Sequence, residues 1–332
     1  MLCCLLAAVG FAACSSDEPA DPSKEHGEVT PQVIFLFSPG GLGDMSYNDC
    51  ILEGVQKFKK AHPEIDIFLY SPQNLGEAER IFTDWLKRPG SDIPVVFTFA
   101  SADYEDIIDR HIDDYELTDN KRILMFESLK RYADERIRTF QVSMFGASYL
   151  CGALAARIDG GSSLVLMASS SDIPTASAKD GFIAGYGREC DVEYLADDWS
   201  GYVMADVTYR RMSGWAANYG FIFPVAGGSN AGLYRYSREY DACPFLAGMD
   251  VDQSGLSKKI TGSVVKRFDL LIDEYFNSWL QTGNMPESQT YGLESGYVEF
   301  MLAPGFSDEF SDFIRANKAA AVEKEKEYEA LN

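Results

Sequence analysis

The sequence of 332 residues is poor in histidine and in basic residues. Its three histidines, His26, His62 and His111, share no short ligand spacing with one another or with a cysteine, so no metal site is expected. Lys and Arg number 29 against 51 Asp and Glu, and the formal net charge is -22. A surface of this sign repels polyphosphates, which disfavours nucleic acid as a partner. We expect no cofactor.

Long hydrophobic runs are also scarce, and the clearest one opens the chain. The segment MLCCLLAAVGFAAC is apolar over roughly a dozen residues, too short for a membrane span but suitable for a signal peptide. It ends in FAAC, which resembles a lipobox. We therefore expect a signal peptide over residues 1–13, lipidation of Cys14 and a polar tether over residues 14–31. The expected location is the cell envelope, on the periplasmic face or exported to the outer surface.

Four cysteines remain in the body of the chain, at Cys50, Cys151, Cys190 and Cys243. Disulfides are permitted in an exported protein, but spacing alone does not pair these residues. The pairing that we favour is Cys190 with Cys243.

From Gln32 onward, apolar runs of strand length alternate with helical patterns, which predicts parallel sheets in an α/β fold. The predicted strands are Val33–Ser38, Ile65–Ser71, Val95–Ala100, Ile123–Phe126, Ser163–Met167, Val192–Leu195, Phe221–Val225 and Phe245–Met249. The predicted helices include Tyr47–His62, Met144–Ile158, Ser177–Arg188, Gly201–Asn218 and Gly232–Tyr240. We expect two doubly wound lobes: residues 32–145 plus about 285–332, and residues 146–284. Such sheets bind ligands beyond the carboxyl ends of their strands.

A glycine-rich turn, FSPGGLGDMSYND, lies between the first predicted strand and helix. Together with four later segments it resembles the basic membrane protein family of substrate-binding lipoproteins, which includes purine nucleoside receptors of ABC transporters. The segments are GDMSYNDCILEG, SYLCGALAA, DGFIAGYG, VAGGSNAGLY, and AGMDVDQSG followed by ITGSVVKRFD. The resemblance implies a type I periplasmic-binding-protein fold with a hinge, binding without catalysis, a nucleoside-like ligand and an ABC permease as partner.

The resemblance also implies which residues bind the ligand. Tyr47 stands where the family has a Phe that stacks on the base, and Glu127 where it has an Asp that faces the base. Asp250 and Lys266 resemble the groups that grip ribose hydroxyls. The full expected set is Asp44, Ser46, Tyr47, Asn48, Glu127, Trp199, Gly227, Gly228, Asp250 and Lys266.

For several of these residues a purely structural role is an alternative to ligand binding. Tyr47 and Trp199 also suit ordinary packing, Ser46 and Asn48 also suit a helix cap, and Glu127 also suits a solvated strand end.

Other functions fit parts of the sequence. A sugar or another ribosylated compound needs the same polar groups and aromatic plate as a nucleoside. The segment FPVAGGSNAG approximates a nucleophile elbow with Ser229, although all three histidines precede it. Gly41, Gly43 and Ser46 approximate a dinucleotide fingerprint that lacks its last glycine.

Overall fold

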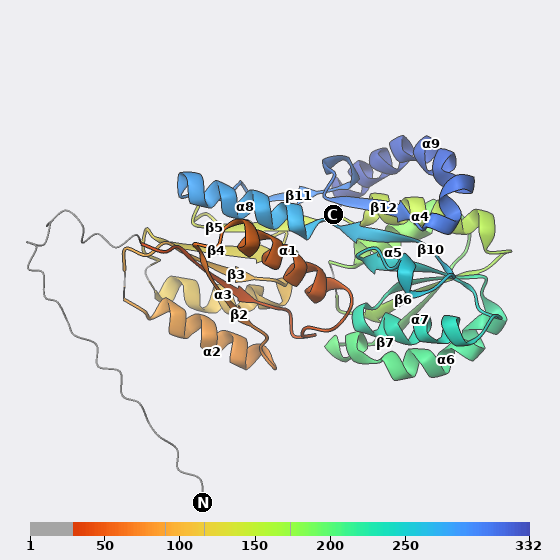
Figure 1. The fold of residues 1–332 in the computed structure, drawn as a ribbon, viewed down its shortest axis with the longest axis horizontal. Coiled ribbons are helices and arrows are strands. Elements are labelled where there is room, and N and C mark those ends of the chain that lie inside the picture. Colours follow the sequence, from red (N-terminus) through yellow and green to blue (C-terminus); the bar gives the residue numbers. More distant parts are fainter. Residues whose placement is uncertain (1–28, 90, 116, 173) are drawn as a thin grey trace, which may run out of the picture.

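A computed structural model describes residues 29–89, 91–115, 117–172 and 174–332 of the chain. This part of the chain forms two six-stranded sheets that lie side by side, each covered by helices (Figure 1). The predicted α/β class is confirmed. The predicted signal peptide and Cys14 lie outside the described residues.

The first sheet has the strand order β11-β5-β4-β3-β1-β2, and its neighbouring strands all pair in parallel. Its strands are β1 (Gln32–Leu36), β2 (Asp66–Tyr70), β3 (Val95–Phe99), β4 (Lys121–Phe126), β5 (Ile137–Val142) and β11 (Gln289–Tyr291). Because β3 is central and covered on both faces, all five of its residues are buried.

The second sheet has the order β12-β10-β9-β8-β6-β7. Its strands are β6 (Ser163–Ser169), β7 (Asp191–Ala196), β8 (Phe221–Val225), β9 (Phe245–Asp250), β10 (Ile260–Lys266) and β12 (Val298–Leu302). All neighbours are parallel except β10 and β12, which are antiparallel. The sequence prediction missed β5 and β10, because IRTFQV and ITGSVVK carry polar and small residues among the apolar ones.

Helices cover both faces of each sheet. They are α1 (Tyr47–Ala61), α2 (Leu75–Leu86), α3 (Glu105–His111), α4 (Phe145–Ile158), α5 (Ala176–Tyr186), α6 (Ala205–Asn218), α7 (Asn230–Glu239), α8 (Phe268–Thr282) and α9 (Pro304–Glu329). The apolar sides of α1, α8, α4 and α5 join one core that continues through both lobes. Separate cores lie under α2 and α3 and under α6 and α7.

Close helix packing in the second lobe depends on glycine. A Cβ atom at Gly152 of α4 would lie 2.1 Å from the carbonyl oxygen of Phe182 in α5. Only glycine lets the two helix backbones approach this closely. The small residues of SYLCGALAA therefore serve the contact between α4 and α5.

The C-terminal part of the chain is divided between the lobes differently from the prediction. Of residues 285–332, β11 joins the first sheet, whereas β12 pairs with β10 in the second and α9 packs against α4. The preceding helix, α8, packs against α1 of the first lobe, because its apolar side completes the core there. The chain thus passes between the lobes after β5, after β10 and after β11 (Figure 1).

The favoured disulfide is wrong. Cys190 packs against the core shared by both lobes, and its thiol donates to the carbonyl oxygen of Ser163. Cys243 packs against the core under α6 and α7, on the other face of the second sheet. All four cysteines of the body are free thiols.

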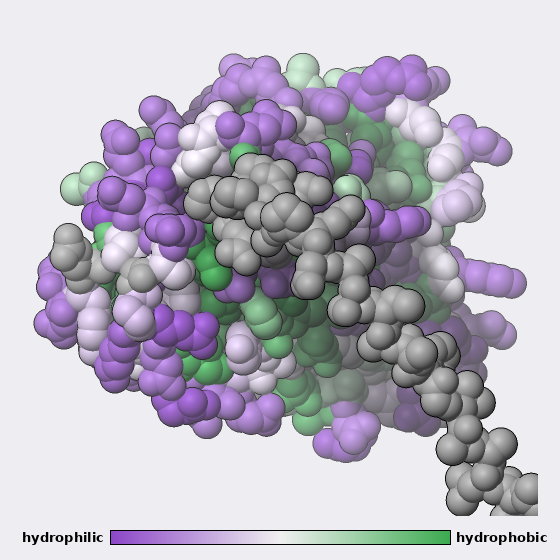
Figure 2. All heavy atoms as spheres, turned by 60° about the vertical axis from the view of Figure 1, so that its left-hand side comes forward, coloured by the Kyte–Doolittle hydropathy of each residue, from purple (hydrophilic) through white to green (hydrophobic). Residues whose placement is uncertain are grey.

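The outer surface is strongly hydrophilic, as the acidic composition leads one to expect. In Figure 2, polar and charged side chains cover most of the visible face, and apolar side chains lie in the recesses between them. Within the described ranges, the helices are all too short or too polar to span a bilayer.

Candidate functional site

A cavity of about 400 Å³ lies between the two lobes, at the carboxyl ends of their parallel strands. This is the place where paired α/β sheets bind ligands, and the volume suits a small molecule. Its walls contain nine of the ten residues expected from the sequence: Asp44, Tyr47, Asn48, Glu127, Trp199, Gly227, Gly228, Asp250 and Lys266. The tenth, Ser46, lies directly behind the wall and bonds to Asp250.

The glycine-rich turn is held in shape by Asp44. Its carboxylate accepts hydrogen bonds from the backbone N–H groups of Ser46, Asn48 and Asp49 at 2.9, 2.9 and 3.2 Å. Burial raises the pKa of Asp44, although these hydrogen bonds oppose the shift. Asp44 therefore caps the N-terminus of α1, the role that the sequence suggested for Ser46 and Asn48. Ser46 occupies the N-cap position but forms no side-chain cap bond.

The same turn is tied to the opposite lobe. The Ser46 hydroxyl donates to Asp250 Oδ2 at 2.5 Å. Gln253 Nε2 donates to the carbonyl oxygen of Met45 at 2.7 Å. These bonds join the loop before α1 to the loop after β9, so the lobes are in contact around this end of the cavity.

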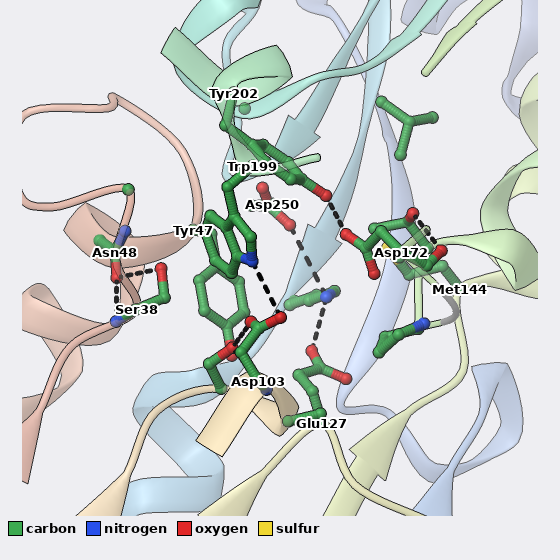
Figure 3. A pocket seen from close by; sticks show the side chains of 18 of the residues that line it. Ser38, Tyr47, Asn48, Asp103, Glu127, Met144, Asp172, Trp199, Tyr202 and Asp250 are labelled. Carbon is green, nitrogen blue, oxygen red and sulfur yellow. Dashed lines mark hydrogen bonds and ion pairs between the residues drawn. The ribbon is translucent and has the colours of Figure 1, made fainter. Parts of the chain in front are cut away.

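A buried group of charges lies at the inner end of the cavity. Lys266 Nζ is 2.6 Å from Glu127 Oε1 and 3.9 Å from Asp250 Oδ1. Burial lowers the pKa of Lys266, but Glu127 and Asp250 outweigh it, so the pKa lies above its ordinary value. Burial raises the pKa of Asp250, against the influence of Lys266 and Ser46. Glu127 directly follows β4 of the first lobe, whereas Asp250 and Lys266 end β9 and β10 of the second. Figure 3 shows Glu127 and Asp250 on the two sides of this group.

The backbone is strained at the same place. Met45, Glu127 and Asp250 adopt positive φ angles of 52°, 62° and 68°. Such conformations are uncommon for residues other than glycine and cost roughly 1 to 3 kcal/mol each. Two of these residues hold Lys266 and the third accepts a bond from the opposite lobe, so the strain coincides with the contacts between lobes.

Aromatic side chains form part of the walls. Tyr47 packs edge-on against Phe268 with 5.3 Å between ring centroids, and Lys266 Nζ lies 5.1 Å from the centre of the Tyr47 ring. Trp199 lies 5.4 Å from Tyr202, and its Nε1 donates to Asp103 Oδ1 at 3.0 Å. Figure 3 shows Tyr47, Trp199 and Tyr202 within the pocket.

Glycines 227 and 228 lie in the cavity wall next to Tyr202, where a side chain has little room. A Cβ atom at Gly227, where φ is 50°, would lie 2.8 Å from the Tyr202 ring. At Gly228 a Cβ atom would lie 3.6 Å from the Cβ of Asp44, across the cavity. Any larger side chain here would narrow the cavity or displace Tyr202.

Asp103, Asp172 and Tyr202 are among the wall residues that sequence reasoning missed. Asp103 follows β3 and Asp172 follows β6, so both come after the carboxyl end of a parallel strand. Their position after these strands was the sequence signal that could have identified them as site residues. The Tyr202 hydroxyl donates to the Asp172 carboxylate, a contact between segments that are 30 residues apart.

The geometry argues against the two enzyme alternatives. The Ser229 hydroxyl is fully buried and donates to the carbonyl oxygen of Gly201 at 2.6 Å. His62 and His111 instead contact the carboxylates of Glu64 and Glu79 in the first lobe. The turn with Gly41 and Gly43 is capped by a carboxylate, which disfavours a phosphate there. Within the part of the chain described, no group of three or more His, Cys, Asp or Glu side chains is arranged to hold a metal ion.

Solved structures share this architecture. The fold resembles a solute-binding protein of an ABC transporter system from Aeropyrum pernix K1, with a TM-score of 0.69 and 15% identity over 90% of this chain and 86% of that one. It also resembles a transcriptional activator of the comK gene from Bacillus halodurans, with a TM-score of 0.64 and 14% identity over 87% and 96% of the chains. A sugar transporter from Clostridium phytofermentans matches with a TM-score of 0.58 and 16% identity over 82% and 99%.

At these identities the structural likeness establishes the periplasmic-binding-protein-like fold. No curated protein sequence matches the chain significantly. The family is established by a family model, described as "ABC transporter substrate-binding protein PnrA-like", which matches residues 31–330. The chain therefore belongs to the PnrA-like family of ABC transporter substrate-binding proteins.

Proposed function

We propose that the protein is a lipid-anchored receptor that captures a purine nucleoside in the cavity between its lobes and delivers it to an ABC permease. Family membership makes it an extracytoplasmic solute-binding protein and not an enzyme. The nucleoside is supported by one observation above all: aromatic rings and a buried group of hydrogen-bonding charges line the same cavity.

The two kinds of group suit the two parts of a nucleoside. Asp250 and Lys266 present a carboxylate and an ammonium, which are able to bind adjacent ribose hydroxyls. Tyr47 and Trp199 offer aromatic faces to a purine ring. Glu127 lines the same wall, and its carboxylate is held by Lys266 at Oε1 and by the backbone N–H of Val142 at Oε2. A carboxylate oxygen accepts more than one hydrogen bond, so Glu127 is able to accept a further one from a ring N–H.

Binding assays with a ligand panel test this proposal. We expect purine nucleosides to raise the melting temperature, to bind with micromolar or tighter affinity in calorimetry, and to be recovered unchanged after incubation. Micromolar affinity corresponds to about 8 kcal/mol of binding free energy. Consumption of the nucleoside would contradict a receptor role.

A sugar is the second candidate, because carboxylates and an ammonium at the inner end of the cavity bind any vicinal diol. One of the structural neighbours is described as a sugar transporter. Stabilisation by hexoses or pentoses, with no response to nucleosides, would favour this candidate over the nucleoside.

The lipid anchor rests on the segment FAAC and on Cys14. We expect Cys14→Ala to abolish incorporation of labelled fatty acid and to release the processed protein from the membrane fraction. A second variant, Cys4→Ala, changes a cysteine of the leader and should leave both properties unchanged. Membrane retention of unlipidated Cys14→Ala protein after leader cleavage would refute the anchor.

A further inference from the structure

Acidic side chains outnumber basic ones in the cavity walls, which bears on the charge of the ligand. Six carboxyl groups line the walls: Asp44, Asp103, Glu105, Glu127, Asp172 and Asp250. The basic side chains of the lining are Lys130 and Lys266. Low-dielectric walls concentrate such an imbalance, so the cavity repels anions and attracts cations.

Both lysines are already used by other carboxylates. Lys266 is bonded to Glu127 and lies close to Asp250. Lys130 forms its ion pair with Asp109, which does not line the cavity. Within the described ranges, Asp103 and Asp172 therefore have no ion pair with a basic side chain.

Asp103 and Asp172 face the cavity from opposite lobes. Asp103 follows β3 in the first lobe, and Asp172 follows β6 in the second (Figure 3). Burial raises the pKa of Asp103, and the nearby charge of Asp172 raises it further. Two like charges that meet across a cleft disfavour its closure, and a positive charge between them removes that repulsion.

The hydrogen bonds to these carboxylates come from the Ser101 hydroxyl, which donates to Asp103, and from aromatic residues of the cavity wall. Asp103 accepts from the Trp199 indole, and Asp172 accepts from the Tyr202 hydroxyl. Aromatic rings next to carboxylates form the surroundings in which proteins bind organic cations, because the face of each ring is electronegative.

An independent observation also points to a ligand here. The Tyr47 hydroxyl is buried and has no hydrogen-bond partner among the described residues. Buried polar atoms are nearly always paired, so this oxygen is free to accept from or donate to a bound molecule. Burial, followed by the charges of Glu127, Asp250 and Asp103, raises the pKa of Tyr47 well above its ordinary value, so the hydroxyl stays neutral.

We propose that the ligand is a cation: a nucleoside-like molecule with a positively charged ring or amine, held between Asp103 and Asp172 and against Trp199 and Tyr202. This inference rests on the proposed function and narrows it. Lys266 and its two carboxylates bind the neutral polyol part of the ligand, while Asp103 and Asp172 select its charge. Nucleotides are rejected because their phosphates would meet unpaired carboxylates.

Matched ligand pairs test the proposal on the full mature chain by isothermal titration calorimetry. The first pair is 1-methyladenosine, which is cationic at neutral pH, and its neutral isomer N6-methyladenosine. The second pair is 5'-amino-5'-deoxyadenosine and adenosine, which moves the charge to the ribose. We expect the wild type to prefer the cation at least about tenfold in one pair, and the preference to shrink as salt is added.

Variants assign the preference to the two carboxylates. Asp103→Asn and Asp172→Asn, alone and combined, should reduce the ratio of the affinity for the cation to that for its neutral partner, to less than about threefold in the double variant. Asp113→Asn is the control, because it removes one exposed negative charge outside the cavity. Melting curves without ligand establish that each variant is folded.

The outcomes separate this inference from the proposed function. If the neutral member of both pairs binds as well as the cation, the inference is overturned and the nucleoside receptor stands. If the preference survives in the folded double variant, the inference is overturned as well. If no nucleoside binds, the proposed function fails. The preference for a cation is then tested with glucosamine, which is positively charged, and glucose, which is neutral. Equal affinity for the two sugars, or binding of neither, overturns the inference.

Discussion

The cavity contains two groups of acidic side chains that differ in how their charge is balanced. At the inner end, Glu127 and Asp250 are buried with exposed fractions of 6% and 5%, and Lys266 lies between them. Nearer to solvent, Asp103 and Asp172 accept hydrogen bonds from aromatic residues, and they form no ion pair with a basic side chain in the part of the chain that the structure describes. Lys266 neutralises charge in the inner group, whereas the charge of the outer pair is left for a ligand to neutralise.

This difference indicates a division of labour. A buried ion pair is stable only when its members are paired and hydrogen-bonded, so the inner group fixes the geometry between β4, β9 and β10 before any ligand arrives. Unpaired carboxylates that still reach solvent have a smaller desolvation penalty, and they remain available to bind a ligand. The inner group should therefore affect stability and binding together, and the outer pair mainly binding.

The largest expected effect comes from removal of the inner cation. Lys266→Met leaves Glu127 and Asp250 buried without a counter-charge, so we expect the free energy of unfolding to fall by about 3 to 5 kcal/mol. Urea unfolding of the unliganded protein measures it. Lys130→Met is the matched control: its partner is Asp109 on the surface, and a loss below about 1 kcal/mol is expected. Equal losses in the two variants would abolish the distinction between inner and outer charges.

The next effect concerns a carboxylate of the inner group. Asp250→Asn keeps the side-chain shape and tolerates the positive φ of this position, but it removes the charge from the proposed hydroxyl site. We expect nucleoside affinity to fall by about 2 to 3 kcal/mol in calorimetry.

The control for Asp250→Asn is a buried carboxylate outside the cavity. Asp159 accepts bonds from Ser163 and Arg188 in the second lobe. Asp159→Asn should lower the free energy of unfolding and leave the affinity of the folded protein unchanged. An unchanged affinity in Asp250→Asn would remove this residue from the site.

The pH dependence of ligand affinity tests the role of the outer pair, Asp103 and Asp172. The pKa of Asp103 lies above the ordinary 3.8, first because of burial. Binding of a cation favours the ionised carboxylate, so affinity for 1-methyladenosine is retained above this pKa. Below it we expect a loss of about tenfold per pH unit, from linkage of one proton.

The pH profile has its own controls, because Asp44 faces the same cavity and burial raises its pKa too. Asp103→Asn should flatten the profile for the cation if Asp103 is the group that titrates. Adenosine gives the reference profile for a neutral ligand. Identical profiles for wild type and Asp103→Asn would show that another group, such as Asp44, is responsible.

The smallest expected effect concerns the contact between the two lobes at the outer pair. Trp199→Phe keeps an aromatic face and removes the hydrogen bond to Asp103, so affinity should fall by about 1 kcal/mol. Trp215→Phe removes a similar indole bond, to Glu193, on the outer face of the second lobe. That variant should change the melting temperature and not the affinity. The reverse pattern would show that Trp199 serves packing alone.

Much of the fold was predictable because local sequence patterns indicate the strands and helices. The buried central strands are continuous apolar runs, and α1 follows a turn whose glycines and polar residues break the pattern, so β1, β3, β8 and α1 were located within a few residues. The strands β5 and β10 were not, since their burial comes from neighbours in the sheet and not from their own composition.

The site was only partly predictable for a related reason. Family motifs pointed to Tyr47, Asp250 and Lys266, and a cavity unites them. Asp103, Asp172 and Tyr202 carry no motif, and their importance depends on which lobe each one faces. The free thiols of Cys190 and Cys243 show the same limit, because the sheet face on which each lies decides whether the two can meet.

The sequence by itself determined the α/β class, the acidic character, the family and the candidate leader, because composition, periodicity and motifs are local properties. Only the tertiary structure decided how the C-terminal segment is shared between the lobes and which charges in the cavity are paired. Lys266 is adjacent to neither Glu127 nor Asp250 in the chain, and Asp103 meets Trp199 from the other lobe. Such balances of charge arise from contacts between distant segments, and no pattern along the chain records them.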